Sequence, residues 1–403
     1  MSRRLRVAIL TIPSTGHVNP TLDLAAELVR RGHDVTYVVP VDFGWAARKT
    51  GAKHQAYRST LAPRPASEPP GPEYACWLPF VLLAEADHVI PQVLPCMEIL
   101  APDVLVYDRT TYPTAHVLGA RLGCRAVQFF PSFAYNQVFS LVGDLERATI
   151  LNPAHESNDA LRTALADGAQ RWGVSELTPD DVVLARCETA IVAVARSFQP
   201  AAETFPLGYV FTGPGLCTRT VVEGEPMPTT GHEVFASLGT AFTNRLADFG
   251  AIVEGIQRGG RAGLLATGGM RGGPTPTDLV DVVAQVDQLA ALAAARVFVT
   301  HAGMGGVQES LAFGVPMVCI PQTSEQRAVA RRVVELGLGE MLEPGVTAAD
   351  VSDAVDRVDR SEVRGRLGMW SRGLKGIDAG SQGADQVERV ADDSATSENL
   401  PQP

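Results

Sequence analysis

The chain has 403 residues, of which 45% are hydrophobic and 20% charged, so it is long enough for two domains with buried cores. Its formal net charge of −11 argues against a nucleic-acid partner, which would require a basic face. The six cysteines have no metal-type spacing, which favours reduced, packed thiols. No cleavage site follows the first apolar run, and no apolar stretch reaches about 18 residues. We therefore expect a cytoplasmic protein without a signal peptide or a membrane span.

The N-terminal third alternates between strand and helix patterns. Apolar runs predict five strands, the third of them weaker: 6–12, 34–40, 54–59, 102–108 and 125–130. A Pro-rich loop is expected at 62–73, and two helical segments around 76–100. Apolar runs joined by helices indicate a parallel sheet that is covered on both faces.

The first domain continues beyond residue 130 with an insertion and two further strands, and after the linker the same alternation restarts in the C-terminal half. Residues 133–180 are predicted to be helical and polar, as in a surface insertion. Further strands are predicted at 189–195, 208–214, 233–239, 262–268, 279–283, 295–301 and 316–321. The predicted fold class is α/β, with two parallel-sheet domains at 1–215 and 232–375 and a Gly/Pro/Thr-rich linker at 216–231. The segment 376–403 is expected to form a helix that packs back on the first domain, followed by a disordered tail.

Two ionisable residues are predicted to meet at the carboxyl ends of strands in the first domain. His17 follows the first strand and precedes a helix, where the helix dipole disfavours a protonated imidazole. Asp108 ends the strand at 102–108, which neighbours the first strand in the common order 3-2-1-4-5. The pair suits a general base whose tautomer is fixed by a carboxylate. A solvated or helix-capping histidine is the alternative reading of His17 alone, and His33 is expected to be a structural turn residue.

The second domain carries features that favour a phosphate group. Ser237, Gly239 and Thr240 follow its first strand, where small residues and hydroxyls suit phosphate oxygens, although such turns are common. The stretch VTHAGMGGVQES is more specific, because His301 stands at a strand end and glycines open the next helix. Glu309, two turns further on, suits ribose hydroxyls. The spacing matches neither a dinucleotide fingerprint nor an ATP phosphate loop.

A neighbouring acid and amide follow a later strand. Glu325 and Gln326 lie in IPQTSEQ, just after the strand at 316–321. Their side chains suit the hydroxyl groups of a sugar. An acid in the first turn of a helix and a solvated amide are the alternative reading.

These motifs together resemble a known family. GHVNP, PDVLVYDRTTYP, SLGTAFT, VDQLAAL, HAGMGGVQESLAFGVPMVCIPQTSEQ and ELGLG are similar to the nucleotide-sugar-dependent glycosyltransferases of the GT-B fold. Within that UDP-glycosyltransferase-like family, the chain looks like the bacterial macrolide and antibiotic group. The resemblance implies two Rossmann-like domains facing each other across a cleft, the N-terminal one binding the acceptor and the C-terminal one the donor.

The resemblance also implies a role for each residue. His17 would deprotonate an acceptor hydroxyl with Asp108 holding it, and the oxygen would attack the anomeric carbon and invert it. His301 would contact the pyrophosphate without a metal or other cofactor, aided by backbone N–H groups of Gly305, Gly306 and Val307. The donor-binding set is Ser237, Gly239, Thr240, Gln285, Val286, Gln288, His301, Gly303, Gly305, Gly306, Val307, Glu309, Glu325 and Gln326.

The chain departs from UDP-using relatives at the base pocket. Those relatives often carry Trp-x-Pro-Gln where this chain has Gln285, Val286, Asp287 and Gln288. Aromatic stacking is worth about 1–3 kcal/mol per base, so its loss matters. Gln285 could lie flat on the base while the backbone of Val286 pairs with its edge. The donor therefore stays open between a UDP-sugar, which is favoured, and a dTDP-deoxysugar.

The acceptor side is predicted to be apolar. Trp77, Phe80, Phe133 and Phe139 lie in segments that line the acceptor cleft of the relatives, although core packing is the alternative for each. Such a cleft suits a macrolide or another polyketide. Two other functions compete: a non-catalytic helper protein on the same fold, and a sugar-nucleotide epimerase or hydrolase. A homodimer is compatible with the glycosyltransferase and with both of these alternatives.

Overall fold

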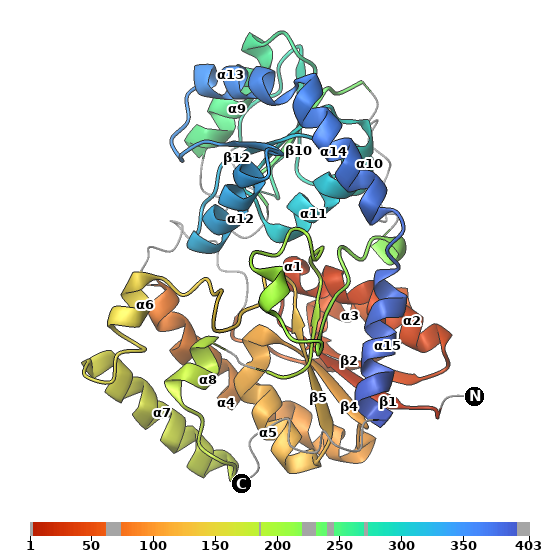
Figure 1. The fold of residues 1–403 in the computed structure, drawn as a ribbon, viewed down its shortest axis with the longest axis vertical. Helices are drawn as coiled ribbons and strands as arrows, with labels where there is room; N and C mark the ends of the chain where they lie inside the picture. Colours follow the sequence, from red (N-terminus) through yellow and green to blue (C-terminus); the bar gives the residue numbers. More distant parts are fainter. Residues whose placement is uncertain are drawn as a thin grey trace. The chain divides into compact units, whose positions relative to one another are not determined.

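The computed structural model describes residues 3–61, 74–184, 187–219, 231–239, 246–269 and 273–392. These residues form two compact units (Figure 1). The first unit contains the described residues up to Arg219 and those from Asp378 onward, and the second contains the residues between them.

The first unit is built on a parallel sheet in which β4 lies at the centre, with β1 beside it. The strand order is β3-β2-β1-β4-β5-β6-β7, which confirms the predicted order of the first five strands. The bounds are β1 Arg6–Leu10, β2 Asp34–Pro40, β3 Lys53–Tyr57, β4 Val104–Asp108, β5 Arg125–Phe130, β6 Ala190–Val192 and β7 Tyr209–Phe211. The central strands are buried on both faces, which explains their nearly continuous apolar runs.

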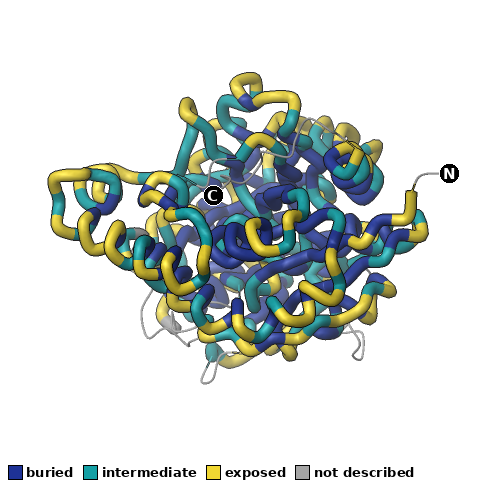
Figure 2. Tube along the Cα trace, turned by 90° about the horizontal axis from the view of Figure 1, so that it is seen from below, coloured by how far each residue is buried: buried dark blue, intermediate teal, exposed yellow. Residues whose placement is uncertain are grey.

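Helices cover both faces of this sheet. One apolar cluster packs it against α2 (Leu22–Arg30), α3 (Gly44–Thr50) and α15 (Ala379–Asp392). A second cluster packs the other face against α4 (Tyr74–Leu100), α5 (Tyr112–Leu122), α7 (Glu156–Trp172) and α8 (Pro179–Leu184). Exposed and buried segments alternate along the helices in Figure 2, as expected for amphipathic helices on a sheet.

The long helix α4 corrects two expectations. It is one continuous helix of 27 residues, although Pro79, Pro91 and Pro95 lie inside it and favour breaks. Its stretch Cys76–Leu100 is also long and apolar enough to cross a membrane by composition, contrary to the expectation from the sequence. Burial accounts for both observations, because Leu83, Val89, Val93 and Met97 of α4 pack in the core of the first unit.

The second unit repeats the parallel architecture with the order β10-β9-β8-β11-β12-β13. Its strands are β8 Val234–Ser237, β9 Gly263–Ala266, β10 Val280–Val283, β11 Val297–Thr300, β12 Met317–Cys319 and β13 Gly339–Met341. Its helices are α9 Leu246–Arg258, α10 Gln288–Ala294, α11 Met304–Phe313, α12 Ser324–Glu335, α13 Ala348–Val358 and α14 Ser361–Leu374. The sequence did not predict β13, because its three half-buried residues form no apolar run.

The C-terminal helix α15 belongs to the first unit, where it packs against α2. Glu388 of α15 accepts hydrogen bonds from Arg31 at 2.7 Å and from Nε2 of the buried His33 at 2.8 Å. His33 therefore has the structural role expected from the sequence. The linker was expected at 216–231. Its residues Cys217–Arg219 form a short 3-10 helix, η5, that belongs to the first unit, and its residues 220–230 lie outside the residues that the structure describes.

Candidate active site

The structure places the two residues expected to act on the acceptor in direct contact. Asp108 ends β4, which pairs with β1 through Leu10 and Tyr107, and His17 lies in the single turn α1 (Thr15–Val18) that follows β1. The imidazole Nδ1 of His17 lies 2.8 Å from Oδ2 of Asp108. The Asp108 side chain is fully buried, whereas 27% of the His17 side chain is exposed. The carboxylate is thus shielded from water, and the imidazole is accessible.

A residue that the sequence analysis missed fixes the other oxygen of Asp108. Thr110 donates to Oδ1 twice, from its backbone N–H at 2.8 Å and from its hydroxyl at 2.5 Å. Oδ2 is therefore the oxygen presented to His17, which donates through Nδ1 and keeps the lone pair on Nε2. The signal in the sequence was the spacing Asp-x-Thr, since Asp108 is also the N-cap of the 3-10 helix η3 (Arg109–Thr111).

In the second unit, the phosphate-favouring residues meet at one edge of the sheet. β8 and β11 are neighbours with Ser237 opposite Thr300, so the loops that follow them leave the sheet side by side. Gly303 is the N-cap of α11 and makes no side-chain cap hydrogen bond to the N–H groups of the first turn, because glycine has no side chain. Ala302 precedes it at a φ of +62°, a conformation that is costly for a residue with a Cβ. Such strain is found at ligand-binding sites.

One predicted donor is corrected at this helix. The backbone N–H of Val307 is hydrogen-bonded to the Gly303 carbonyl at 3.1 Å, as the fifth residue counted from an N-cap should be. The predicted phosphate contact from Val307 is therefore wrong, whereas Gly305 and Gly306 lie in the first turn, where N–H groups have no intrahelical partner.

His301 lies between two glycine backbones. A Cβ on Gly239, whose φ is +80°, would approach the His301 ring to 2.8 Å, and one on Gly303 would approach it to 2.5 Å. Both positions therefore require glycine for the ring to fit. Burial lowers the pKa of His301 to about 4, so the ring is neutral near pH 7. Its Nδ1 is buried and has no hydrogen-bond partner among the described residues.

The residues expected to hold the ribose also meet. Gln288 begins α10, and its Nε2 donates to Oε2 of the buried Glu309 at 2.6 Å. Gln285 is exposed and Val286 is half-buried in the loop before α10. Ser237 is buried and accepts a hydrogen bond from the Gly239 N–H, and Thr240 lies outside the described residues.

The two residues expected to contact the sugar differ in their surroundings. Glu325 is exposed in the first turn of α12. The Oε1 of Gln326 accepts a hydrogen bond from the backbone N–H of Gln322 at 2.8 Å, so this oxygen already closes the loop before α12.

The aromatic residues expected at the acceptor side separate into surface and core. Trp77 is 64% exposed, and its ring centroid lies 5.9 Å from that of the half-buried Phe80. Phe133 is only 2% exposed and stacks on Phe198 at 5.8 Å, with Phe139 against its edge. Phe133 therefore packs in the core, which corrects its expected role as an acceptor contact.

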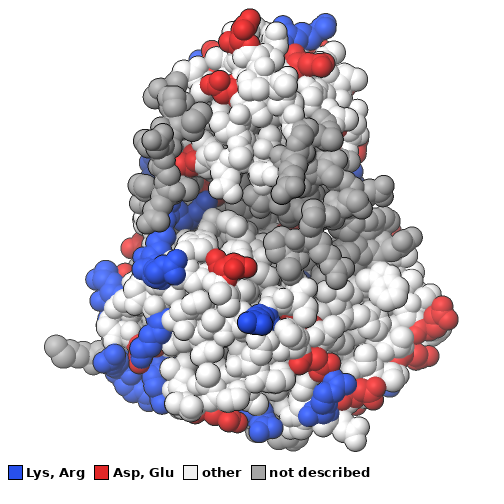
Figure 3. All heavy atoms as spheres, turned by 180° about the vertical axis from the view of Figure 1, so that it is seen from behind, with Lys and Arg blue, Asp and Glu red and all other residues white. Residues whose placement is uncertain are grey.

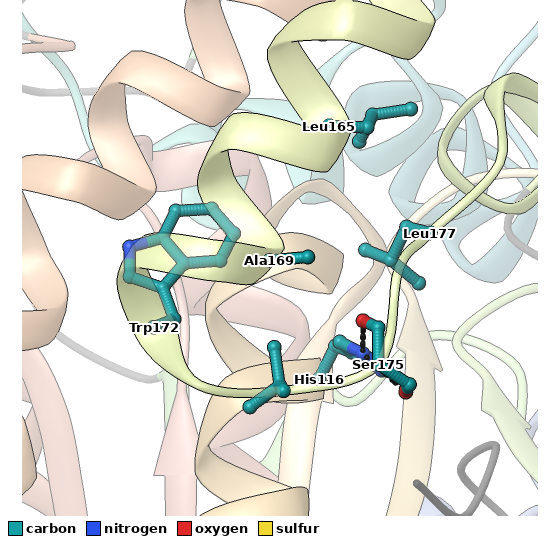
Figure 4. A pocket seen from close by; sticks show the side chains of 7 residues that line it. His116, Leu165, Ala169, Trp172, Ser175 and Leu177 are labelled. Atoms are coloured by element: carbon teal, nitrogen blue, oxygen red, sulfur yellow. Dashed lines mark hydrogen bonds between the residues drawn. The ribbon is translucent and has the colours of Figure 1, made fainter.

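A small pocket elsewhere in the first unit has no features of a reactive site (Figure 4). His116 lines it together with Trp172 and Leu165, and lies beside Ser175, to whose carbonyl its Nε2 donates at 3.0 Å. Burial lowers the pKa of His116, so this histidine is a neutral structural residue. On the face in Figure 3, groups of Lys and Arg side chains follow one another along the left side, and acidic groups are scattered over a surface that is otherwise mostly uncharged.

The fold and site together define a class of enzyme. A histidine–carboxylate contact lies at the carboxyl end of one parallel sheet, and the glycine-rich start of α11 and the Gln288–Glu309 contact lie at the carboxyl end of the other. This combination is that of the GT-B nucleotide-sugar glycosyltransferases. Residues 241–366 match the family model described as UDP-glucoronosyl and UDP-glucosyl transferase.

Full-length relatives extend this match to the whole chain. NDP-glycosyltransferase YjiC of Bacillus licheniformis is 32% identical over 394 residues, which cover 95% of this chain and 96% of the relative. Demethyllactenocin mycarosyltransferase of Streptomyces fradiae is 32% identical over 383 residues, covering 88% and 80%. CalG4, the calicheamicin glycosyltransferase, has a TM-score of 0.80 and 29% identity, covering 98% of this chain and 100% of its own. The chain belongs to this family, in the group of bacterial macrolide and antibiotic glycosyltransferases.

Proposed function

We propose that the protein is an inverting, metal-independent hexosyltransferase that uses a nucleotide diphosphate sugar, with a UDP-sugar favoured, and a hydroxyl of a hydrophobic natural product. The observation that carries the proposal is the 2.8 Å contact between Nδ1 of His17 and Oδ2 of Asp108. The contact fixes the tautomer that a general base requires.

The proposed reaction begins with proton transfer to His17. Nε2 accepts the proton of the acceptor hydroxyl, and Asp108 stabilises the imidazolium that forms. The acceptor oxygen forms a bond to the anomeric carbon from the face opposite the nucleotide, and the bond between that carbon and the diphosphate oxygen breaks. A single displacement of this kind inverts the anomeric centre.

The leaving diphosphate carries the negative charge that develops in this step. The uncapped N–H groups of the first turn of α11 suit that charge. The imidazole of His301, which is neutral near pH 7 because burial lowers its pKa to about 4, lies at the same edge and can contribute its dipole without a change in its protonation state. These groups supply the stabilisation in the proposed mechanism, and Gln288 and Glu309 hold the ribose.

The apolar surface around Trp77 and Phe80 supports a hydrophobic acceptor. The names of relatives favour the same class, because one is an oleandomycin glycosyltransferase, 31% identical over 378 residues. We propose a macrolide or another polyketide as the acceptor and the cytoplasm as the place of action. A dTDP-deoxysugar is the second candidate donor, because Gln285 occupies the position of the stacking tryptophan.

The deciding experiment is a mass-spectrometric screen of UDP- and dTDP-sugars against polyketide acceptors. We expect glycosylated products with the wild type and none with His17→Ala, which should keep its nucleotide affinity. Normal turnover by His17→Ala would refute the mechanism. Failure to bind either UDP or dTDP in calorimetry would favour the helper protein, and rapid release of free sugar without an acceptor would favour the hydrolase.

A further inference from the structure

Gln322 is a buried amide without a partner at the sugar-nucleotide edge of the second sheet. Its side chain is only 8% exposed, and neither its Oε1 nor its Nε2 has a hydrogen-bond partner among the described residues. Buried amides are normally paired, because leaving both atoms unpaired is costly. The absence of a protein partner therefore requires an explanation.

The position of Gln322 in the fold points to a ligand. β12 pairs with β11 with Cys319 opposite Thr300, and the next N–H, that of Ile320, still donates to the Thr300 carbonyl at 2.7 Å. The loop that carries Gln322 thus leaves the sheet beside the loop that begins with His301. Ligands of open parallel sheets bind outside these carboxyl ends.

Hydrogen bonds hold the backbone of the loop that carries Gln322, whereas the side-chain amide of Gln322 has none among the described residues. The backbone N–H of Gln322 donates to Oε1 of Gln326, and the N–H of Gln326 donates to the Thr323 hydroxyl at 3.3 Å. These two bonds hold the backbone from Gln322 to Gln326 at the start of α12. They also occupy one of the two amide atoms of Gln326, which leaves Gln322 as the amide with both atoms available.

We propose that Gln322 binds the donor sugar and selects a sugar that carries hydroxyl groups where its amide lies. This inference rests on the proposed function. An amide offers one donor group and one acceptor, and this matches a hydroxyl, which can accept and donate, better than a phosphate oxygen, which only accepts. A deoxysugar that lacks the hydroxyl leaves the amide unpaired, and sites of this kind discriminate strongly against such an analogue.

The test measures binding of UDP, UDP-glucose and monodeoxy UDP-glucose analogues by calorimetry. Gln322→Met keeps the length of the side chain and removes both polar atoms, and Gln322→Glu keeps only the acceptors. Gln257→Met is the matched control, because Gln257 is an exposed glutamine of α9 in the same unit. The affinity for UDP alone reports whether each variant folds and retains the nucleotide site.

We expect the wild type to prefer UDP-glucose to one monodeoxy analogue by about fivefold or more, the effect of one hydrogen bond. Gln322→Met should lose this preference while its affinity for UDP and that of Gln257→Met stay within about twofold of the wild type. The same preference in Gln322→Met, or a wild type that binds UDP-glucose no tighter than UDP, would overturn the inference. If the wild type shows the preference but transfers no sugar to any acceptor, the proposed function fails and the sugar contact stands.

Discussion

Replacement of Asp108 by asparagine tests the geometry of the proposed base most directly. The carboxylate accepts hydrogen bonds from His17 at 2.8 Å and from the N–H and hydroxyl of Thr110 at 2.8 and 2.5 Å. An asparagine has only one oxygen, so its NH2 group must face either His17 or Thr110. Each orientation breaks a different contact.

With the NH2 group toward His17, Nδ1 has to accept and the ring proton moves to Nε2, which then cannot accept the proton of the acceptor hydroxyl. A general base is worth about 10²–10⁴ in rate, so kcat should fall by a factor in that range. With the NH2 group toward Thr110, two N–H donors face each other, and the cost is about 1–3 kcal/mol in stability.

The assay is steady-state turnover with the donor saturating, together with the melting temperature and the affinity for the nucleotide. Asp34→Asn is the matched control, because Asp34 pairs with the exposed Lys53 and begins β2 at the opposite end of the sheet. Asp108→Asn should lose turnover and keep its affinity for the nucleotide, whereas Asp34→Asn should keep both. Turnover of Asp108→Asn within about threefold of the wild type, with unchanged stability, would refute the assigned roles.

Three further predictions follow from contacts in the two units. Gly239→Ala should weaken nucleotide binding at least tenfold in calorimetry, because its Cβ would press on His301 at 2.8 Å, whereas Gly250→Ala, with open space around it, should bind normally. Glu388→Gln should lower the free energy of unfolding, measured in urea, by about 1–3 kcal/mol, because it weakens the hydrogen bonds that Glu388 accepts from Arg31 and His33. The control is Asp385→Asn, which should cost under about 1 kcal/mol because the Asp385 side chain is 65% exposed. The lowered pKa of His301 means that the unfolded chain binds its proton first, so the melting temperature should fall more between pH 6.5 and 4 in the wild type than in His301→Asn, and equal pH profiles would contradict this.

The sheet order and the contact between His17 and Asp108 were predictable because they depend on local pattern and general topology. Apolar runs joined by helices indicate a parallel sheet, and the common strand order then brings Asp108 beside His17, 91 positions away in the sequence. The continuity of α4 was not predictable, because burial of its apolar side chains outweighs the local effect of Pro79 and its other prolines. Local propensity does not contain that information.

The features that the sequence did not reveal depend on side-chain geometry and on neighbours from distant segments. The spacing of Thr110 from Asp108 is visible in the sequence, but which carboxylate oxygen it occupies is a matter of side-chain geometry. The exposure of Trp77 and the burial of Phe133 likewise depend on neighbours from other segments, such as Phe198. Gln322 could be recognised only by counting the partners of its amide, which requires coordinates.

The two sheets differ in how fully their polar groups are paired before any substrate binds. In the first unit, both oxygens of Asp108 are already held, so the base–carboxylate geometry exists in the free protein and needs no substrate to form. In the second unit, Nδ1 of His301 and the amide of Gln322 are buried without partners among the described residues. A bound donor that pairs these groups gains hydrogen bonds without displacing others. In the proposed reaction, the free energy of donor binding is then concentrated on the diphosphate and the sugar, the two groups that separate, while the proposed base and its carboxylate are preorganised.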